Sequence, residues 1–357
     1  MRVAAATALL LTVVGCGIHT APFEDQRGRV VPGSIATMTD LTIGGVRQRV
    51  WFRGTSLDNP ALILLHGGPG ASEAALFRRF TPELEQSYLV VYWEQRGSGR
   101  SYHGDIPPES MTIARFVSDL DELVEAVRTR FGKDRVVLVG HSWGTAIGLL
   151  YAAAHPEKVA AYVGVAQVAD MRRGERLSRE FALREARRRK HRGAIEELES
   201  IGDPPHMVSQ MLTSRKWVER FGGSFHADLS TGKLIWAALR TDEANLCDLI
   251  RFGRGNRFSL RSLWEEFRTL DLTARHTSFD VPIAFFLGRH DWQVPAVLAA
   301  EYFDRIQAPR KRLVWFERSA HNPPFEQPAD FARILRDELQ QMTAPAGGER
   351  GARERRQ

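Results

Sequence analysis

The chain has 357 residues, of which 43% are hydrophobic and 26% are charged, an ordinary globular mixture with enough apolar side chains for a large core. Its formal net charge of +6 comes with no recognisable nucleic-acid-binding module, so we expect a solvated basic surface and no nucleic-acid partner. With two cysteines the chain is not expected to depend on disulfides, and its length suggests one large α/β domain with room for an inserted subdomain.

The first 16 residues are typical of an export signal. Met1-Arg2 precedes an apolar run, Val3–Val14, that is too short for a comfortable membrane span. The run ends in Val13-Val14-Gly15-Cys16, which resembles a bacterial lipobox, in which the cysteine is diacylated and becomes the new N-terminus. We therefore expect residues 1–16 to be a lipoprotein-type signal peptide and a lipid on Cys16 to anchor the exported protein to a membrane. The alternatives are a signal peptide without lipid, or a cytoplasmic enzyme whose N-terminal segment is not a working signal.

Strands and helices alternate along residues 36–169, after a predicted tether over 17–35. Two strand-like pieces around Gly44-Gly45 predict a hairpin. Apolar runs predict buried strands at Pro60–Leu65, Tyr88–Trp93, Arg135–Val139 and Ala161–Val165, and a helical pattern extends from Thr112 to about Arg130. This alternation favours an α/β fold with a mostly parallel, doubly wound sheet.

The alternation stops at residue 170 and resumes at residue 278. The intervening segment carries charged, helix-like stretches such as Arg172–Arg192 and scattered aromatic residues, which predict a helical cap over 170–277, inserted after the sixth strand. Cys247 lies in one of these helical patterns and is expected to pack like an apolar side chain. The core is expected to resume over 278–342 and to be followed by a disordered basic tail over 343–357.

The stretch Gly140-His141-Ser142-Trp143-Gly144 fits G-x-S-x-G and lies between a predicted strand and a predicted helix. That is the context of a nucleophile elbow. The turn strains the serine backbone, and only residues without a Cβ fit at the crowded flanking positions. The hydroxyl of Ser142 then stands clear of the sheet at the positive end of the next helix, which makes Ser142 the candidate nucleophile.

A serine hydroxyl needs a base to remove its proton, and the base needs an orienting carboxylate. Asp291 and His321 each follow a predicted strand, and the chain order Ser, acid, His is that of the α/β hydrolases. We therefore predict Ser142, Asp291 and His321 as the catalytic residues. His290 is a rival base and Asp170 a rival acid, and Asp291 is preferred over Asp170.

Negative charge that develops on a substrate oxygen is stabilised by two convergent backbone N–H groups. One donor is expected from Trp143, the residue after the nucleophile. The other is expected from the glycine-dense loop after the third strand, where the candidates are Gly67 and Gly68 and we prefer Gly68.

Several motifs together resemble those of the proline iminopeptidase branch of the α/β-hydrolase superfamily. They are His66-Gly67-Gly68-Pro69-Gly70, Gln95-Arg96-Gly97-Ser98-Gly99-Arg100-Ser101, the elbow itself, Gly288-Arg289-His290-Asp291 and Ser319-Ala320-His321. The resemblance covers residues 36–342 in order. It implies a serine hydrolase that releases N-terminal residues, often proline, from short peptides or amides, with no metal and no organic cofactor.

Two positions depart from that pattern. Glu94 stands where the family usually has Asp before Gln-Arg-Gly, and His141 replaces an elbow glycine, as in many esterases and epoxide hydrolases of the same fold. The resemblance also implies an anionic site for the substrate's ammonium, formed in the family by cap glutamates, for which Glu243 and Glu180 are nominees. Epoxide hydrolases and haloalkane dehalogenases would need Asp at position 142 and are disfavoured.

The sequence therefore predicts a serine hydrolase that works through an acyl-enzyme and is most similar to a proline iminopeptidase. Its expected partners are a small peptide, amide or ester substrate and, through Cys16, a membrane. One alternative is a carboxylesterase or lipase-like hydrolase of small or acyl esters. The other is a catalytically silent, lipid-anchored binding protein.

Overall fold

The computed structural model describes residues 19–344. The predicted signal peptide with Cys16 lies outside the described residues, as do residues 345–357 of the predicted basic tail. Within the described part, a sheet of eight strands has the order β1-β2-β4-β3-β5-β6-β7-β8. The strands are β1 (Ile35–Ile43), β2 (Val46–Gly54), β3 (Ala61–Leu65), β4 (Leu89–Trp93), β5 (Val136–His141), β6 (Val159–Val165), β7 (Ile283–Gly288) and β8 (Lys311–Phe316).

The sheet is parallel from β4 to β8 and antiparallel at one edge, which confirms the predicted fold class. The predicted hairpin is formed by β1 and β2, whose turn residues Gly44 and Gly45 both have positive φ. β2 pairs antiparallel with β4, and each later neighbour is parallel. Strands β3, β4, β5 and β7 are buried along their whole length, which explains why they read as unbroken apolar runs.

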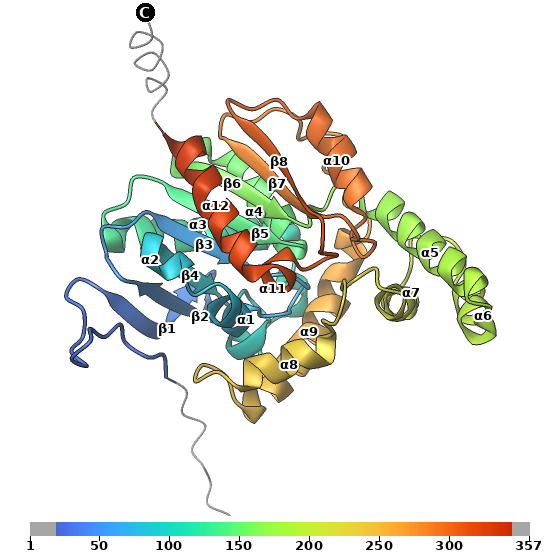
Figure 1. Cartoon of the computed structure of the whole chain (residues 1–357), viewed down its shortest axis with the longest axis horizontal. Helices are drawn as coiled ribbons and strands as arrows, with labels where there is room; N and C mark the ends of the chain where they lie inside the picture. The colour runs from blue at the N-terminus through green and yellow to red at the C-terminus, as the bar shows by residue number, and fades with distance from the viewer. Residues whose placement is uncertain (1–18, 345–357) are drawn as a thin grey trace, which may run out of the picture.

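Helices cover both faces of the sheet (Figure 1). The helices of the core are α1 (Ala74–Phe80), α2 (Leu84–Ser87), α3 (Ile113–Phe131), α4 (Trp143–Ala154), α10 (Ala296–Arg305), α11 (Pro323–Glu326) and α12 (Pro328–Thr343), with short 3₁₀ turns η1 (Gly99–Ser101), η2 (Pro108–Ser110) and η3 (Pro156–Lys158). One buried cluster joins the sheet to α3, α4 and α10, and the other joins its opposite face to α1, α2 and α12. Two apolar layers therefore hold the sheet from either side.

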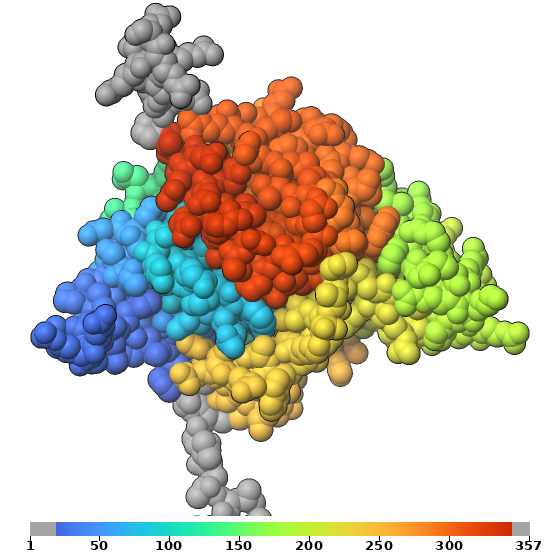
Figure 2. Space-filling model, in the orientation of Figure 1, coloured from blue at the N-terminus to red at the C-terminus, as the bar shows by residue number. Residues whose placement is uncertain are grey.

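A run of helices stands between β6 and β7, where the alternation of strand and helix is interrupted. It comprises α5 (Met171–Arg188), α6 (Arg192–Ser200), α7 (Val208–Arg220), α8 (Thr231–Leu239) and α9 (Leu246–Phe267). Helices α5 to α7 share a small apolar cluster of their own and project from the side of the molecule (Figure 2). Helix α9 packs against η1 and α3 and so ties this cap to the core.

The first described residues pack against the core next to the cap. The guanidinium of Arg53 donates a hydrogen bond to the carbonyl of Ala21 at 2.8 Å and lies 4.8 Å from the ring centroid of Phe23. The hydroxyl of Thr20 donates to Glu243, in the loop between α8 and α9. The segment predicted as a tether thus makes specific contacts from Thr20 onward. Across residues 19–344, none of the helices combines the length and the apolar character that crossing a membrane requires.

Candidate active site

Ser142 occupies a strained turn between β5 and α4. Its φ of 52° and ψ of −117° lie outside the regions that L-residues ordinarily adopt. The turn has no room for side chains on either flank, since a Cβ at Gly140 would lie 2.7 Å from the Gly144 carbonyl oxygen and a Cβ at Gly144 would lie 2.1 Å from the Leu65 carbonyl oxygen. The predicted elbow is therefore present, and Ser142 immediately precedes the N-terminus of α4.

Asp291 and His321 are hydrogen-bonded to each other, at 2.8 Å between Oδ2 and Nδ1. They follow β7 and β8, and each is only 3% exposed. The other carboxylate oxygen of Asp291 accepts the N–H groups of Gln293 and Val294, both at 2.9 Å, which fixes the direction of the carboxylate. Because a carboxylate accepts, Nδ1 of His321 carries the proton, and Nε2 is left as the basic nitrogen.

The rival residues have other roles in the structure. Asp170 is the N-cap of α5, where its side chain accepts the N–H of Arg173. The ring of His290 stacks on that of His226, with the ring centroids 4.1 Å apart. Of the candidate acids and bases, Asp291 and His321 are the two that the structure pairs.

Burial makes His321 a neutral base. Loss of solvent lowers the pKa of His321 below its ordinary value, and the neighbouring Asp291 carboxylate offsets only part of that effect. The imidazole is therefore unprotonated at neutral pH. Within residues 19–344, no hydrogen bond joins the Ser142 hydroxyl to His321; such contacts commonly tighten only when substrate is bound.

The loop between β3 and α1 touches the nucleophile. A Cβ built on Gly67 would lie 3.3 Å from the Cβ of Ser142. The Gly67 N–H is donated to the Glu73 carboxylate at 2.9 Å, so of the two glycines considered as an oxyanion donor only Gly68 keeps its N–H for a ligand. Gly68 has φ of 120°, a conformation that favours glycine. Trp143 is the first residue of α4, so its N–H has no acceptor within the helix.

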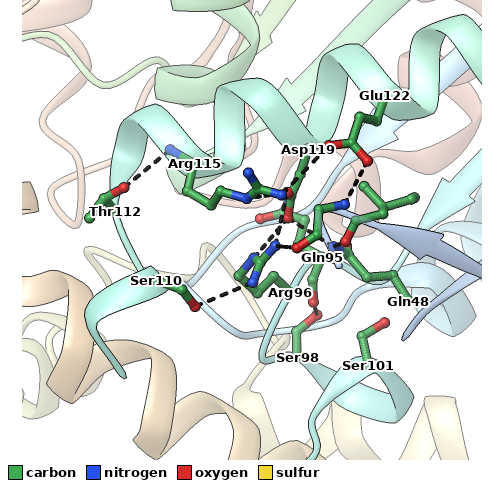
Figure 3. A network of polar contacts seen from close by, with 12 residues as sticks. Gln48, Gln95, Arg96, Ser98, Ser101, Ser110, Thr112, Arg115, Asp119 and Glu122 are labelled. Atoms are coloured by element: carbon green, nitrogen blue, oxygen red, sulfur yellow. Dashed lines mark hydrogen bonds and ion pairs between the residues drawn. The ribbon is translucent and has the colours of Figure 1, made fainter. Parts of the chain in front are cut away.

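The side chain of Gln95 connects its own loop after β4 to the glycine loop that begins at His66 and to the elbow. Its amide nitrogen donates to the His66 carbonyl at 3.1 Å, and its amide oxygen accepts the indole N–H of Trp143 at 2.9 Å. The next residue, Arg96, forms a buried two-point ion pair with Asp119 of α3 and also donates to the carbonyl of Gly44 (Figure 3). The loop after β4 therefore acts as a rigid bridge between the glycine loop, the elbow and the β1–β2 hairpin.

Glu326 of α11 holds the loop that carries His321. One of its carboxylate oxygens accepts the N–H groups of Ala320 and Asn322, at 2.9 and 3.0 Å, on either side of His321. Burial raises the pKa of Glu326 to about 7, despite these hydrogen bonds. The sequence analysis did not find this residue, because its partners are backbone groups that leave no mark in the sequence.

His141 and Glu73 form a second arrangement that the sequence analysis missed. The Nδ1 atom of His141 lies 2.9 Å from both carboxylate oxygens of Glu73, and Nε2 lies 3.0 Å from the carbonyl oxygen of His321. The signal that could have found it is the unusual histidine beside the nucleophile, which needs hydrogen-bond partners for its ring nitrogens if it is buried.

A cavity of about 210 Å³ adjoins the β3–α1 loop and is closed on its other side by α8 and α9. Its wall is mainly apolar, formed by side chains that include Trp51, Leu76, Leu234, Ile235, Leu239 and Phe252. Four carboxylates also line it: Glu73, Glu94, Glu243 and Asp248. Ser142, Asp291 and His321 do not line this cavity. Glu73 is common to the cavity wall and the candidate site, because its carboxylate also accepts the N–H of Gly67, next to Ser142.

The carboxylates that line the cavity differ in whether an arginine already lies close enough to balance their charge. Asp248 is paired with Arg100 at 2.7 Å, and Glu243 lies 3.6 Å from the guanidinium of Arg78. Burial raises the pKa of Glu94 to about 7, although its carboxylate accepts the N–H of Arg100. Of the two nominees for an ammonium site, Glu243 lines the cavity, whereas Glu180 is exposed on α5. Across the described residues, no group of three or more His, Cys, Asp or Glu side chains is placed to hold a metal ion.

Comparison with known proteins agrees with this architecture. Residues 60–189 match the model of a family described as alpha/beta hydrolase fold. The chain is 35% identical over 305 residues to "Probable aminopeptidase YbaC" of Bacillus subtilis, which covers 85% of this chain and 96% of that protein. It is 35% identical over 120 residues to the proline iminopeptidase of Neisseria gonorrhoeae, a match that spans 33% of this chain and 36% of that enzyme.

Solved structures share the fold at low sequence identity. A proline iminopeptidase-related protein from Thermus thermophilus superposes with a TM-score of 0.61 at 19% identity, over 87% of this chain and 99% of that one. The proline iminopeptidase of Mycobacterium smegmatis gives a TM-score of 0.61 at 18% identity, over 86% and 99% of the two chains. The elbow, the Asp291–His321 pair and the long match to the Bacillus subtilis relative show that this chain is a hydrolase that belongs to the α/β-hydrolase family, in its proline iminopeptidase-like branch.

Proposed function

We propose that this protein is a serine aminopeptidase that cleaves the N-terminal residue from short peptides or amides through an acyl-enzyme. The observation that carries the proposal is the buried Asp291–His321 hydrogen bond, formed by the loops after β7 and β8, together with a serine in the strained elbow of the same sheet. The long similarity to a protein named as a probable aminopeptidase supports the choice of substrate class.

In this proposal Ser142 attacks the carbonyl carbon of the substrate while Nε2 of His321 takes the hydroxyl proton. Asp291 keeps the imidazole in the tautomer with Nδ1–H and stabilises the imidazolium that forms. The N–H groups of Trp143 and Gly68 receive the oxyanion. His321 then returns the proton to the leaving amine, and water, activated by the same imidazole, hydrolyses the acyl-enzyme.

The cavity supplies what an aminopeptidase needs beyond these groups. A free N-terminal amine is cationic near neutral pH, and an apolar wall with a buried carboxylate would hold both the ammonium and the side chain next to it. Glu94 suits this role because an arriving ammonium favours its ionised form, and Glu243 lines the same cavity. Holding the amine at a fixed place would set which carbonyl reaches Ser142.

A comparison of matched substrates tests the substrate class. Proline p-nitroanilide, alanine p-nitroanilide and their N-acetylated forms are assayed with the purified protein, beside p-nitrophenyl butyrate. The proposal predicts that amides with a free amine are hydrolysed and that N-acetylation reduces kcat/KM by at least ~100-fold, since the ammonium contact is lost. Turnover of the ester without turnover of any amide would contradict it.

A carboxylesterase is the second candidate. The observation that favours it is the mainly apolar wall of the cavity, in which Asp248 is already paired with Arg100 and Glu243 lies near Arg78. Such a wall would accept an acyl chain of an ester. The same substrate comparison decides between the two, because an esterase would show no preference for a free amine.

We also propose that the protein is an exported lipoprotein attached to a membrane through Cys16. The support for this lies in the sequence of residues 1–16, with its apolar run and its lipobox-like end. Labelling cells with an alkyne fatty acid should mark the protein, and Cys16→Ser should abolish the label and release the protein from the membrane fraction. Equal labelling of both forms would refute lipid attachment at this residue.

A further inference from the structure

His141, the neighbour of the candidate nucleophile, has acceptors on both sides of its ring. Nε2 lies 3.0 Å from the carbonyl oxygen of His321, and Nδ1 lies 2.9 Å from the Glu73 carboxylate. A carbonyl oxygen can only accept, so Nε2 must carry a proton. The ring is 2% exposed and is packed edge-on by Phe77 and Phe325, so it has little freedom to turn away.

Glu73 in turn reaches the oxyanion loop. Its Oε2 atom accepts the N–H of Gly67 at 2.9 Å while the same carboxylate binds His141. The pair therefore connects the loop after β3, the elbow after β5 and the loop after β8. Of the candidate catalytic groups, only Asp291 comes from a different loop.

The charges around the pair favour an imidazolium and a carboxylate. Burial opposes the charged form of His141, but the Glu73 carboxylate, the His321 carbonyl and Asp291 together outweigh burial and raise the pKa of His141 above its ordinary value. Burial likewise opposes ionisation of Glu73, and His141, the Gly67 N–H and His66 together outweigh it, so the pKa of Glu73 is lowered. The other titratable groups facing the pair are His66, Asp291 and the ring of His321, whose centroid lies 5.2 Å from that of His141.

We propose that Glu73 and His141 are positioning residues for the reaction of the proposed function: together they fix the His66–Gly67 peptide unit, which directly precedes the Gly68 N–H, and the backbone of His321 relative to Ser142. In this proposal neither residue transfers a proton to the substrate. Their contribution is to hold two catalytic loops in register with the elbow, so the inference rests on Ser142 being the nucleophile.

The geometry also says which substitution should preserve the function. A glutamine at position 73 can accept the Gly67 N–H through its oxygen and donate to Nδ1 of His141 through its nitrogen. A neutral His141 with the proton on Nε2 then still donates to the His321 carbonyl. Glu73→Gln therefore keeps each hydrogen bond and removes both charges, whereas Glu73→Ala and His141→Ala remove the connections.

The test measures kcat and KM of wild type, Glu73→Ala, His141→Ala, the double variant and Glu73→Gln. Each is assayed on a free-amine anilide and on p-nitrophenyl butyrate, which has no amine. Removing an orienting partner of this kind costs ~10–100-fold, so we expect each alanine variant to lose that much in kcat on both substrates, with KM changed by less than ~3-fold. The double variant should be no worse than the worse single variant, since the two residues act as one unit. Glu73→Gln should retain kcat within ~3-fold.

A pH profile adds a readout that a loss of stability would not produce. As pH rises through the raised pKa of His141, the ring loses its Nδ1 proton and presents a lone pair to the Glu73 carboxylate. We expect kcat of wild type on the ester to fall at alkaline pH for this reason. Glu73→Gln has no charge to repel and should not show the fall.

The control is Asp121→Ala on α3. Asp121 accepts the Tyr151 hydroxyl at 2.8 Å, at the end of α4 far from the elbow, and pairs with Lys158 of η3. It should lower the melting temperature and leave kcat unchanged. Alanine variants at 73 and 141 that unfold at a lower temperature yet keep wild-type kcat would overturn the proposal. So would Glu73→Ala raising only the KM of the free-amine substrate, which would make Glu73 an amine-binding residue.

Failure of this inference can be told apart from failure of the proposed function. Labelling of Ser142 by a fluorophosphonate in the wild type reports on the nucleophile alone. If wild type is labelled and the alanine variants are labelled at the same rate, the pair has no positioning role although the nucleophile is correct. Slower labelling of both alanine variants, restored in Glu73→Gln, supports the proposal.

Discussion

Arg96 and Asp119 form a buried ion pair in which two parallel hydrogen bonds, at 2.8 and 3.0 Å, join the guanidinium to the carboxylate. The two side chains are only 2% and 0% exposed. Asp119 belongs to α3, whereas Arg96 lies in the loop whose neighbouring residue Gln95 contacts both the glycine loop and Trp143. The pair thus fixes the base of the candidate site to the helix behind it.

We predict that Asp119→Ala destabilises the protein by about 3–5 kcal/mol, because it leaves the Arg96 guanidinium buried without a counter-charge. Urea unfolding followed by circular dichroism measures this. Asp337→Ala, which removes a half-exposed partner of Arg333 on α12, should change stability by less than about 1 kcal/mol. Equal effects of the two substitutions would show that the Arg96–Asp119 pair does not anchor the loop.

Two glycine-to-alanine substitutions should have opposite effects on stability. At Gly144 the new Cβ would lie 2.1 Å from the backbone oxygen of Leu65, so Gly144→Ala must displace a central strand or the elbow. At Gly174, inside α5, the nearest atom would be 3.8 Å away, and alanine is the better helix former by ~1 kcal/mol. We expect thermal unfolding to show a lower melting temperature for Gly144→Ala and a higher one for Gly174→Ala. A neutral Gly144→Ala would refute the close packing at the elbow.

If Asp291 is the catalytic acid, its substitution should reduce kcat far more than substitution of the rival Asp170. Asp291→Asn should reduce kcat by ~10⁴-fold, since the amide favours the wrong tautomer of His321. Asp170→Asn, at a helix N-cap where asparagine is equally suitable, should leave kcat within ~2-fold of wild type. Steady-state kinetics on the best anilide or ester measures both. A large loss at Asp170 with a small one at Asp291 would reverse the assignment.

The raised pKa of Glu94 leads us to expect that substrate binding depends on pH. Its pKa is raised to about 7 by burial, so the carboxyl is charged above that pH and neutral below it. If it holds the substrate ammonium, KM for a free-amine anilide should increase as pH falls from ~8 to ~6, while KM for p-nitrophenyl butyrate stays constant. Glu94→Gln should have a high KM for the anilide throughout this range. An identical pH dependence of KM in Glu94→Gln would exclude Glu94 as the amine site.

The sequence allowed the fold and much of the site to be predicted because their signals are local. Buried parallel strands appear as continuous apolar runs, as in Ala61–Leu65, and the elbow appears as a serine between two glycines that the packing requires. The pairing of His321 with Asp291 was predicted from the chain order and from the position of each residue just after a predicted strand. These features depend on neighbouring residues or on a recurrent order of motifs.

The missed residues depend on contacts between distant loops. Glu73 contacts His141, 68 residues further along the chain, and Glu326 accepts the backbone N–H of His226, 100 residues before it. A carboxylate in such a role looks the same in the sequence as a solvated one. The sequence also could not show which of Glu243 and Glu180 lies near the site, because this depends on which face of the cap packs against the core. Local patterns locate elements, whereas the supporting shell of a site is defined only by the tertiary fold.

The central claim is that Ser142 is the nucleophile activated by His321, and covalent labelling tests it most directly. The purified protein is treated with a fluorophosphonate, digested and analysed by mass spectrometry. We predict one phosphonylated residue, Ser142, in the wild type, no labelling of Ser142→Ala and at least ~100-fold slower labelling of His321→Ala. Labelling that persists in Ser142→Ala, or that occurs at wild-type rate without His321, would contradict the account.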